Sequence, residues 1–293
     1  MTPPDYEYLR KLLKDRSGLD LSADKQYLIE SRLLPLSRKV GLSGISELVQ
    51  KMKDGSASLI SQVVEAMTTN ETFFFRDKVP FEHFRGSIMP EILQARAGRK
   101  SLRIWCAAGS TGQEPYSLAM CLKEMGAALA GWRVEILATD LSQEVLEKSK
   151  AGIYSQFEVQ RGLPIQMLVK YFKQIGELWQ INPDIRTMVQ HREFNLLHDF
   201  WGLGVFDVIF CRNVLIYFDQ DAKGGIFDRL AKSLDPDGVL VLGAAESVVG
   251  ISDAFQPYPE RRGLYRPSGA RAIPSRMSDI GTGAAKVAAM AGR

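Results

Sequence analysis

Long hydrophobic runs, cysteines and histidines are scarce in this 293-residue sequence. The longest apolar run, residues 239–245, stops at Glu246 and is too short to span a bilayer. The first residues lack the apolar segment of a secretory signal. The three cysteines (Cys106, Cys121 and Cys211) form no C-x-x-C pair, and three scattered histidines argue against a metal site. We therefore expect a cytoplasmic protein with reduced thiols and no bound metal.

The net charge of +3 belongs to one end of the chain. Residues 268–293 contain four basic residues and one acidic residue, which leaves the remainder of the chain neutral. Domains that bind nucleic acid are usually basic, so we expect no nucleic-acid partner. The same end segment is rich in Ala, Gly and Ser, and we expect it to be a disordered tail.

The first 67 residues carry apolar side chains at helical spacing. One example is the series Ile29, Leu33 and Leu36, and Gly18 and Gly41 interrupt the pattern. These spacings predict a small all-helical domain over residues 1–69.

From residue 102 onward, short apolar segments alternate with helical patterns. The predicted strands are residues 102–107, 134–139, 206–211 and 239–245. The helical patterns between them lie at about 114–126, 142–151, 164–173 and 219–234. This alternation predicts an α/β fold, with a parallel sheet covered by helices on both faces, over residues 70–267.

Two smaller β features are also predicted. Residues 178–181 and 185–191 flank Asn182-Pro183-Asp184 and suggest a hairpin, which would form a small antiparallel subdomain at about residues 174–192. Residues 263–266 would add a last edge strand to the large sheet.

The turn after the first predicted strand is rich in glycine. Gly109 and Gly112 match two glycines of the dinucleotide-binding pattern G-x-G-x-x-G, but Ala107 replaces the first. In an open α/β sheet, ligands bind beyond the carboxyl ends of the strands, so this turn marks the expected site.

Two acids indicate which ligand this turn binds. Glu114 stands where a dinucleotide would place its pyrophosphate, and a carboxylate there would repel phosphate but attract a cation. Asp140, at the end of the second strand, can accept hydrogen bonds from ribose hydroxyls. Together they favour S-adenosylmethionine, which is an adenosine carrying an ammonium and a sulfonium. The alternatives are a first-turn acid for Glu114 and a helix N-cap for Asp140, although Ser142 is available as the cap.

Polar residues at later strand ends, and in the segment before the sheet, extend this site. Asn195, Arg212 and Asn213 could contact adenine or the methionine part, although Asn195 could equally be a turn residue. The segment Asn-Glu-Thr-Phe-Phe-Phe-Arg at residues 70–76 could roof the site, with Arg76 as a carboxylate ligand, or could be an apolar interdomain plug.

These motifs, in this order, resemble the CheR-type chemotaxis receptor methyltransferases over about residues 5–267. The motifs that carry the resemblance are NETFFFR, GSTGQEPYS, ATDLS, FNLLHD and FCRNVLIYF. The resemblance implies methyl transfer from S-adenosylmethionine to glutamate side chains of chemoreceptor cytoplasmic helices. It also implies a Rossmann-like domain with a small antiparallel insertion, preceded by a helical receptor-docking domain.

The resemblance also implies roles for particular residues. The family's cofactor contacts fall on Asn70, Thr72, Arg76, Glu114, Asp140, Asn195, Leu196, Arg212 and Asn213. Tyr217 matches the family's tyrosine near the methyl group, and with Arg76 it would position the acceptor carboxylate. Arg32 and Arg38 match the arginines of the receptor-docking helix. Gln113 and Pro35 depart from the family pattern, which usually has Glu and frequently has a basic residue at these positions.

Two other functions are compatible with parts of the sequence. One is a methyltransferase that acts on a nucleic acid or a small molecule, and the other is a non-catalytic cofactor sensor that binds receptors. Asn182-Pro183-Asp184 lacks the signature of base methylation, and a sensor could lose Arg76 or Tyr217, which are both present.

Some members of the family first bind a pentapeptide at the receptor C-terminus through a longer, glycine-rich loop of the small subdomain. The corresponding stretch here, residues 172–179, is short and has one glycine. We therefore expect the enzyme to recognise the methylation helices directly, without a pentapeptide tether. We also expect a monomer.

Overall fold

A computed structural model describes residues 1–269 of the chain, and the predicted tail lies outside the described residues from 270 onward. Its first part is helical, as the sequence predicts. The four helices are α1 (Pro3–Ser17), α2 (Gln26–Lys39), α3 (Ile45–Lys53) and α4 (Ala57–Met67). They enclose a core of their own, with Leu9, Leu13, Ile29, Leu33 and Leu48 fully buried.

Local signals define both ends of α1. Thr2 and Asp5 form a capping box, in which the Thr2 hydroxyl accepts the Asp5 N–H and the Asp5 carboxylate accepts the Thr2 N–H. Gly18 ends the helix in the left-handed conformation, with φ of 77°. A Cβ at Gly18 would lie 2.1 Å from the Phe218 ring, so glycine also lets α1 approach the second part of the chain closely.

A short helical stretch leads into the large sheet. It consists of α5 (Val79–His83), one π-helical turn η1 (Phe84–Ile88) and α6 (Met89–Ala95). The large sheet has the strand order β6-β2-β1-β7-β8-β10-β9. In that order the strands are Val189–Glu193, Arg133–Asp140, Ser101–Ala107, Phe206–Cys211, Leu234–Leu242, Leu264–Pro267 and Phe255–Pro257. The first five are parallel to one another, whereas β10 and β9 pair antiparallel.

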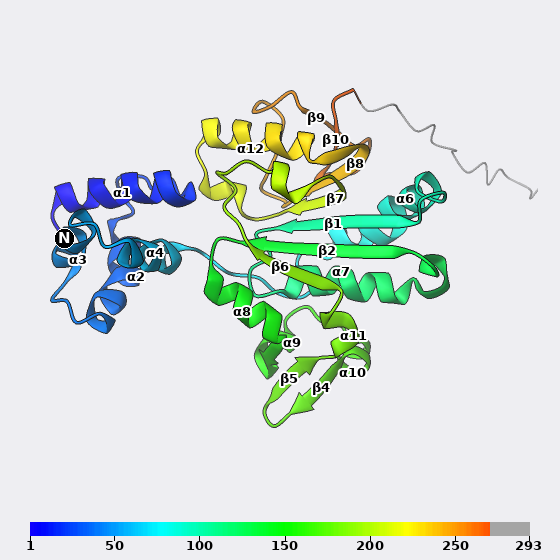
Figure 1. The fold of residues 1–293 in the computed structure, drawn as a ribbon, viewed down its shortest axis with the longest axis horizontal. Helices are drawn as coiled ribbons and strands as arrows, with labels where there is room; N and C mark the ends of the chain where they lie inside the picture. The colour runs from blue at the N-terminus through cyan, green and yellow to red at the C-terminus, as the bar shows by residue number, and fades with distance from the viewer. Residues whose placement is uncertain (270–293) are drawn as a thin grey trace, which may run out of the picture.

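Helices cover both faces of this sheet, as predicted. Along β1, Ile104 and Cys106 face one buried cluster, to which α7 (Gln113–Glu124) contributes. Trp105 and Ala107 face the other cluster, to which α12 (Gln220–Lys232) contributes. Further helical segments of this part are η2 (Gly126–Leu129), α8 (Gln143–Ala151), η3 (Trp201–Leu203) and η4 (Leu215–Tyr217). In Figure 1 the arrowheads of β1 and β2 point toward the N-terminal helices, so the carboxyl ends of these strands face that domain.

The small antiparallel sheet exists, but the predicted hairpin is wrong. The sheet has the order β3-β5-β4, with strands Ile153–Ser155, Leu178–Ile181 and Phe172–Ile175. It therefore spans residues 153–181 rather than 174–192, and α9 (Gln156–Gln160) and α10 (Ile165–Tyr171) lie between its strands.

The second arm of the predicted hairpin belongs to the large sheet instead. Pro183 begins the short helix α11 (Pro183–Arg186), which takes the chain away from β5. Val189 then pairs in parallel with Ile136, so β6 becomes an edge strand beside β2. The predicted last edge strand is also corrected, because β10 lies between β8 and β9, and β9 is the edge.

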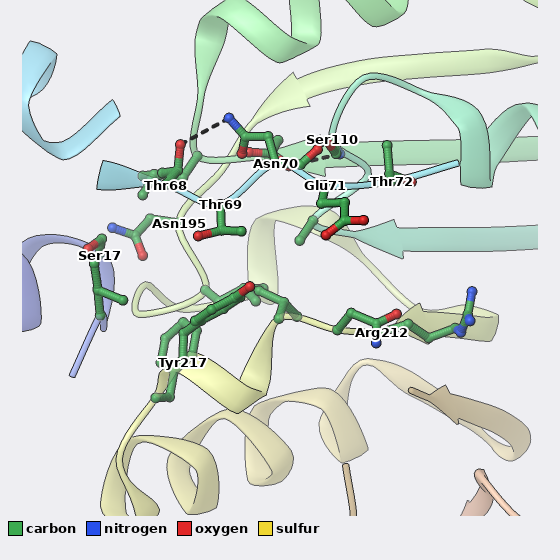
Figure 2. A pocket seen from close by; sticks show the side chains of 18 of the residues that line it. Ser17, Thr68, Thr69, Asn70, Glu71, Thr72, Ser110, Asn195, Arg212 and Tyr217 are labelled. Carbon is green, nitrogen blue, oxygen red and sulfur yellow. Dashed lines mark hydrogen bonds between the residues drawn. The ribbon is translucent and has the colours of Figure 1, made fainter. Parts of the chain in front are cut away.

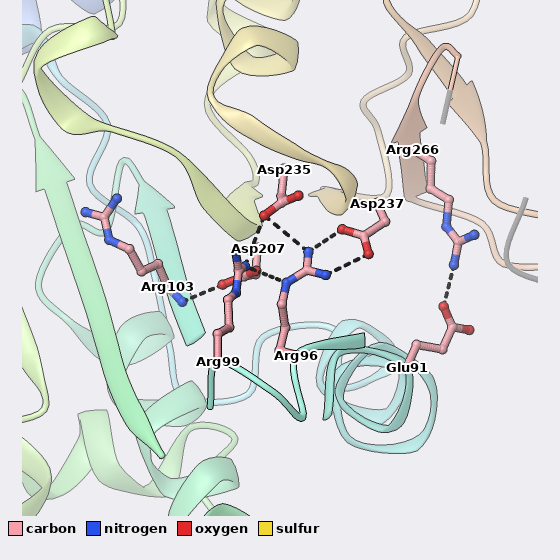
Figure 3. A network of polar contacts seen from close by, with 8 residues as sticks. All are labelled: Glu91, Arg96, Arg99, Arg103, Asp207, Asp235, Asp237 and Arg266. Atoms are coloured by element: carbon pink, nitrogen blue, oxygen red, sulfur yellow. Dashed lines mark hydrogen bonds and ion pairs between the residues drawn. The ribbon is translucent and has the colours of Figure 1, made fainter. Parts of the chain in front are cut away.

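An ion-pair network lies at the amino ends of the parallel strands, opposite the end that faces the N-terminal helices (Figure 3). Arg96 Nε donates to Asp207 at 2.8 Å, and its other nitrogens contact Asp237. Arg99 contacts Asp207 and Asp235. The network ties the turn before β1 to the starts of β7 and β8.

Candidate functional site

The main pocket opens at the carboxyl ends of β1, β2 and β7, as the glycine-rich turn predicts. Its walls enclose about 980 Å³, including the open mouth. All ten residues predicted to bind the cofactor or position the acceptor line it: Asn70, Thr72, Arg76, Glu114, Asp140, Asn195, Leu196, Arg212, Asn213 and Tyr217. Helices α1 and α4 contribute Ser17 and Met67, and the loop after α1 contributes Leu19, so the pocket lies between the two parts of the chain.

The pocket has two facing walls. Figure 2 shows residues 68–72, which connect α4 to the second part of the chain, on one side. Arg212 and Tyr217, from the loop after β7, lie on the other side. We call residues 68–72 the linker.

The turn after β1 has the geometry of a ligand-binding loop. Ala108 and Ser110 have φ of 64° and 49°, a left-handed conformation that is strained for residues with a side chain. Gly112 has φ of 97°, and a Cβ there would lie 2.2 Å from Ser149 Oγ. Glycine is therefore required at position 112 for α7 to start against α8.

Asp140 supports this turn from the end of β2. Its carboxylate accepts the Ser110 N–H at 2.9 Å and the Ser142 N–H at 3.0 Å. The alternative role of N-cap belongs instead to Ser142, whose hydroxyl accepts the Val145 N–H at the start of α8. Burial raises the pKa of Asp140, although these two backbone hydrogen bonds oppose the shift.

Glu114 is buried in the first turn of α7 beside a buried arginine. Arg212, whose side chain is 1% exposed, donates to Glu114 and to Asp77, each at 2.7 Å. Burial raises the pKa of Glu114, and the neighbouring Arg212 opposes that shift. The Nε–H of Arg212 is buried and has no acceptor among the described residues, so one donor remains available.

The segment at residues 70–76 both roofs the pocket and plugs the core. Phe74 and Phe75 are buried, and Phe74 packs on Tyr154 and Phe172 of the small sheet at 5.1 and 5.5 Å between ring centroids. Arg76 lies over the Phe73 ring and donates to the Glu71 carbonyl at 2.7 Å. Phe74 and Phe75 therefore form the apolar plug, whereas Asn70, Thr72 and Arg76 line the pocket.

Several predicted residues also hold the two parts of the chain together. Asn195 Nδ2 donates to the Arg16 carbonyl at 2.7 Å, and its Oδ1 accepts the Leu197 N–H, as in an Asx turn. The Tyr217 carbonyl accepts the Asp20 N–H at 2.9 Å. Tyr217 also lines the pocket, and among the described residues its hydroxyl has no hydrogen-bond partner.

The two predicted docking arginines have different surroundings. Arg38 is exposed near the end of α2. Arg32 is half-buried, and its guanidinium donates to Met67 O at 2.6 Å, Thr68 O at 2.8 Å and Thr69 Oγ1 at 2.9 Å. Arg32 therefore holds the end of α4 and the start of the linker, and its guanidinium does not face solvent freely.

Sequence reasoning missed three residues that organise the site. Asp77 pairs with Arg212, and Glu65 of α4 accepts the Ser142 hydroxyl and the Glu144 N–H at the start of α8. Glu246 accepts four backbone N–H groups next to Asn213. No sequence pattern marks these contacts, because each joins segments that are far apart in the chain.

The fold and the pocket define a class of enzyme. A glycine-containing turn after β1, an acid at the end of β2 and a carboxylate at the start of α7 suit a nucleoside ligand that carries a positive charge. S-adenosylmethionine has this chemistry, so the architecture is that of an S-adenosylmethionine-dependent methyltransferase.

Comparison with known proteins gives the family. Residues 70–264 match the family model described as "CheR methyltransferase, SAM binding domain", and residues 4–68 match "CheR methyltransferase, all-alpha domain". The chain belongs to the CheR methyltransferase family, and S-adenosylmethionine is its cofactor.

Three relatives illustrate this similarity. Chemotaxis protein methyltransferase 1 of Pseudomonas aeruginosa is 43% identical over 258 residues, which cover 86% of this chain and 93% of the relative. Chemotaxis protein methyltransferase Cher2 of Pseudomonas putida is 42% identical, with coverage of 86% and 93%. A chemotaxis protein methyltransferase of Vibrio anguillarum is 40% identical, with coverage of 87% and 94%. The chain is therefore a methyltransferase of chemotaxis. Within the described residues, no helix is both long and apolar enough to cross a membrane.

Proposed function

We propose that this enzyme methylates glutamate side-chain carboxylates of chemoreceptor cytoplasmic helices and forms methyl esters. The observation that carries the proposal is the composition of the pocket wall. Among the described residues that line it there is no His, Lys or Cys, whereas Arg76 and Tyr217 offer hydrogen-bond donors. Such a wall suits an acceptor that is already ionised and needs no general base.

The acids of the wall are engaged in other contacts. Glu114 is paired with Arg212, and Asp140 accepts two backbone N–H groups. Glu71 lies against Arg161 at 2.5 Å, and this contact lowers the pKa of Glu71. None of these carboxylates is a free base for deprotonating an amine or a hydroxyl acceptor.

The bound cofactor supplies its methyl group on a positively charged sulfonium, so a carboxylate oxygen can accept it without losing a proton. Glu114 would hold the ammonium of the cofactor, and Asp140 would hold its ribose. Asn70, Thr72, Asn195, Leu196, Arg212 and Asn213 would complete the cofactor site. Arg76 and Tyr217 would orient the acceptor carboxylate, a proximity effect worth up to ~7–11 kcal/mol when well aligned.

Receptor docking through α2 is part of the proposal. Arg38 and Lys39 are exposed, and so is Tyr27, which is 62% exposed on the same helix. A receptor bundle with several glutamates is an acidic partner for this face. Because Arg32 is bound to the linker, we propose that Arg38 makes the docking contact and that Arg32 acts through the linker.

Recognition without a pentapeptide tether is the second part of the proposal. In the small sheet, β4 and β5 are joined only by Gly176 and Glu177, with Gly176 at φ of 59°. A two-residue turn is too short to fold over a peptide bound at the edge of β4.

Transfer of a labelled methyl group tests the acceptor chemistry. The enzyme, labelled S-adenosylmethionine and a receptor cytoplasmic fragment should yield labelled receptor that releases methanol in mild base. A fragment with glutamines in place of the acceptor glutamates is the matched control and should stay unlabelled. Base-stable label would indicate an amine acceptor and would contradict the proposal.

A further inference from the structure

The carboxylate of Glu246 accepts four backbone N–H groups from two loops. Its Oε2 accepts the N–H of Asn213 and of Gly243, both at 2.8 Å. Its Oε1 accepts the N–H of Val214 at 3.0 Å and of Leu215 at 2.8 Å. The loops after β7 and β8, two neighbouring parallel strands, are joined through this one side chain.

The three amides at residues 213–215 belong to the loop that forms one wall of the pocket. Asn213, Val214 and Tyr217 all line the pocket. Asn213 has φ of 57°, a left-handed conformation that costs energy in a residue with a side chain. This conformation aims successive N–H groups at one point, which is the geometry of an anion-binding nest. The loop therefore depends on an anion that occupies the nest.

Gly243 shows how closely the two loops approach. A Cβ at this position would lie 2.7 Å from Glu246 Oε2 and 2.9 Å from Asn213 Nδ2. Only glycine leaves room for the carboxylate and the Asn213 amide at the same time. Glu246 itself is not among the residues that line the pocket, so any effect on the reaction must pass through the loop.

We propose that Glu246 is a positioning residue for methyl transfer, because its carboxylate fills the backbone nest at residues 213–215 and so fixes Tyr217 against the acceptor. The inference rests on the proposed function wherever turnover is measured, because turnover requires the receptor as the methyl acceptor. The anion in the nest is supplied by the chain itself, so a small free carboxylate should be able to replace it.

Glu246→Gln is the first test, because glutamine has the same shape but turns one acceptor oxygen into a donor. Two of the four N–H groups then lose their acceptor. Turnover should fall about tenfold to a hundredfold, as expected for a small misplacement of a reacting group. Affinity for S-adenosylhomocysteine should also fall, because Asn213 is a proposed cofactor contact within the nest. It should fall less than turnover, because Glu114 and Asp140 are held by other contacts. The matched control is Glu82→Gln, which removes the same charge from an exposed position on α5.

Glu246→Ala with added formate is the second test. Formate should restore turnover in a saturable manner, whereas sodium chloride of the same ionic strength should not, and formate should leave the wild type and Glu82→Gln unchanged. Absence of rescue, wild-type turnover in Glu246→Gln, or equal losses of turnover, cofactor affinity and thermal stability in both variants would overturn the proposal. The last pattern would mark a general structural role.

Amide hydrogen exchange of residues 212–218 separates this inference from the proposed function. With S-adenosylhomocysteine bound, exchange in this segment should be faster in Glu246→Gln than in wild type, and formate should slow it in Glu246→Ala. This readout needs no receptor. If the wild type failed to methylate receptors, the proposed function would fail while the exchange data still tested the nest. Unchanged exchange in both variants would overturn the inference.

Discussion

At the scale of single residues, Asp140 has one observed and one proposed role in the pocket. It is proposed to bind the cofactor ribose, and it already accepts two backbone N–H groups that shape the turn after β1. Asp140→Asn keeps one acceptor oxygen but removes the charge. Affinity for S-adenosylhomocysteine at neutral pH should fall by ~1.5–3 kcal/mol, as for the loss of a hydrogen bond to a charged group. Calorimetry measures this, and an unchanged dissociation constant would refute the assignment.

The same carboxylate predicts a pH dependence of cofactor binding. Burial raises the pKa of Asp140 above its ordinary value of 3.8, so it takes up a proton at a higher pH than an exposed aspartate. The charged acceptor is then lost as the pH falls through this raised pKa. Affinity for S-adenosylhomocysteine should decrease on acidification, more steeply in wild type than in Asp140→Asn. Superimposable pH profiles would contradict this role.

Tyr217 is the residue whose removal should separate turnover from binding. Its hydroxyl lines the pocket without a partner among the described residues, so loss of the oxygen leaves the fold intact. Tyr217→Phe should lower kcat by about one to two orders of magnitude and change cofactor affinity little, the pattern of a contact made mainly in the transition state. Steady-state kinetics with calorimetry decides this, and an unchanged kcat would reduce Tyr217 to a packing residue.

At the scale of elements, helix α2 has one arginine facing the linker and one facing solvent. Arg38→Glu should lower receptor methylation about two- to fivefold, equivalent to ~0.5–1 kcal/mol for an exposed charge pair. Its effect should shrink as salt rises, and cofactor affinity should not change. Arg32→Glu should weaken cofactor binding as well, because three hydrogen bonds to residues 67–69 are lost.

Both variants can be measured together with calorimetry and the methylation assay. The contrast between them is the informative result. If Arg32→Glu bound cofactor normally, the linker contact would have no influence on the pocket, and if Arg38→Glu were fully active at low salt, α2 would not be the docking face.

The Arg96 network should set the stability of the sheet. The side chains of Arg96 and Asp207 are 7% and 3% exposed, so removal of Arg96 takes one of two arginine partners from a buried carboxylate and leaves Asp207 with Arg99. Arg96→Met should lower the free energy of unfolding by ~1.5–3 kcal/mol, as for the loss of a hydrogen bond to a charged group. The exposed Arg85→Met is the control. Denaturant titrations that place both variants at the wild-type midpoint would contradict this.

The network should also make the stability of the fold depend on pH. The hydrogen bond from Arg96 lowers the pKa of Asp237 below its ordinary value of 3.8. A carboxyl whose pKa is lower in the folded state stabilises the fold above its unfolded pKa. That contribution is lost as the pH falls through the folded pKa, and Arg96→Met should remove it.

At the scale of the whole molecule, the periodic elements were predictable from sequence and the contacts between distant segments were not. The helical stripes at residues 1–67 and the strands at 102–107 and 206–211 follow from local apolar spacing. The predicted hairpin at 178–191 is wrong because tertiary contacts decide which strands pair. Strand β6 pairs with the edge of β2, and β5 pairs with β3 and β4.

The candidate site shows the same division. The sequence motifs predict that Asn70, Glu114, Asp140 and Tyr217 share a site, and all four line one pocket. The prediction is possible because the carboxyl ends of parallel strands meet at one edge of the sheet. No pattern in the sequence indicates that Arg32 faces the linker or that Glu246 fills a backbone nest. Side chains that serve backbone groups leave no periodic pattern.

Independence from a pentapeptide tether is a prediction at the scale of the whole molecule. Titration of the family's C-terminal pentapeptide into the protein should give no saturable heat, because the turn between β4 and β5 has only two residues. Binding in the low micromolar range, about −8 kcal/mol, would show that another segment closes over the peptide.

The most direct test of the central claim is to identify the methylated residue. A receptor cytoplasmic fragment is incubated with the enzyme and S-adenosylmethionine, digested at mildly acidic pH and sequenced by tandem mass spectrometry. The account predicts one added methyl group on glutamate side chains, at least about tenfold less of it when Tyr217→Phe is used for the same short incubation, and loss of the modification after mild base. A methyl group on lysine, arginine or a main-chain amine would contradict the account.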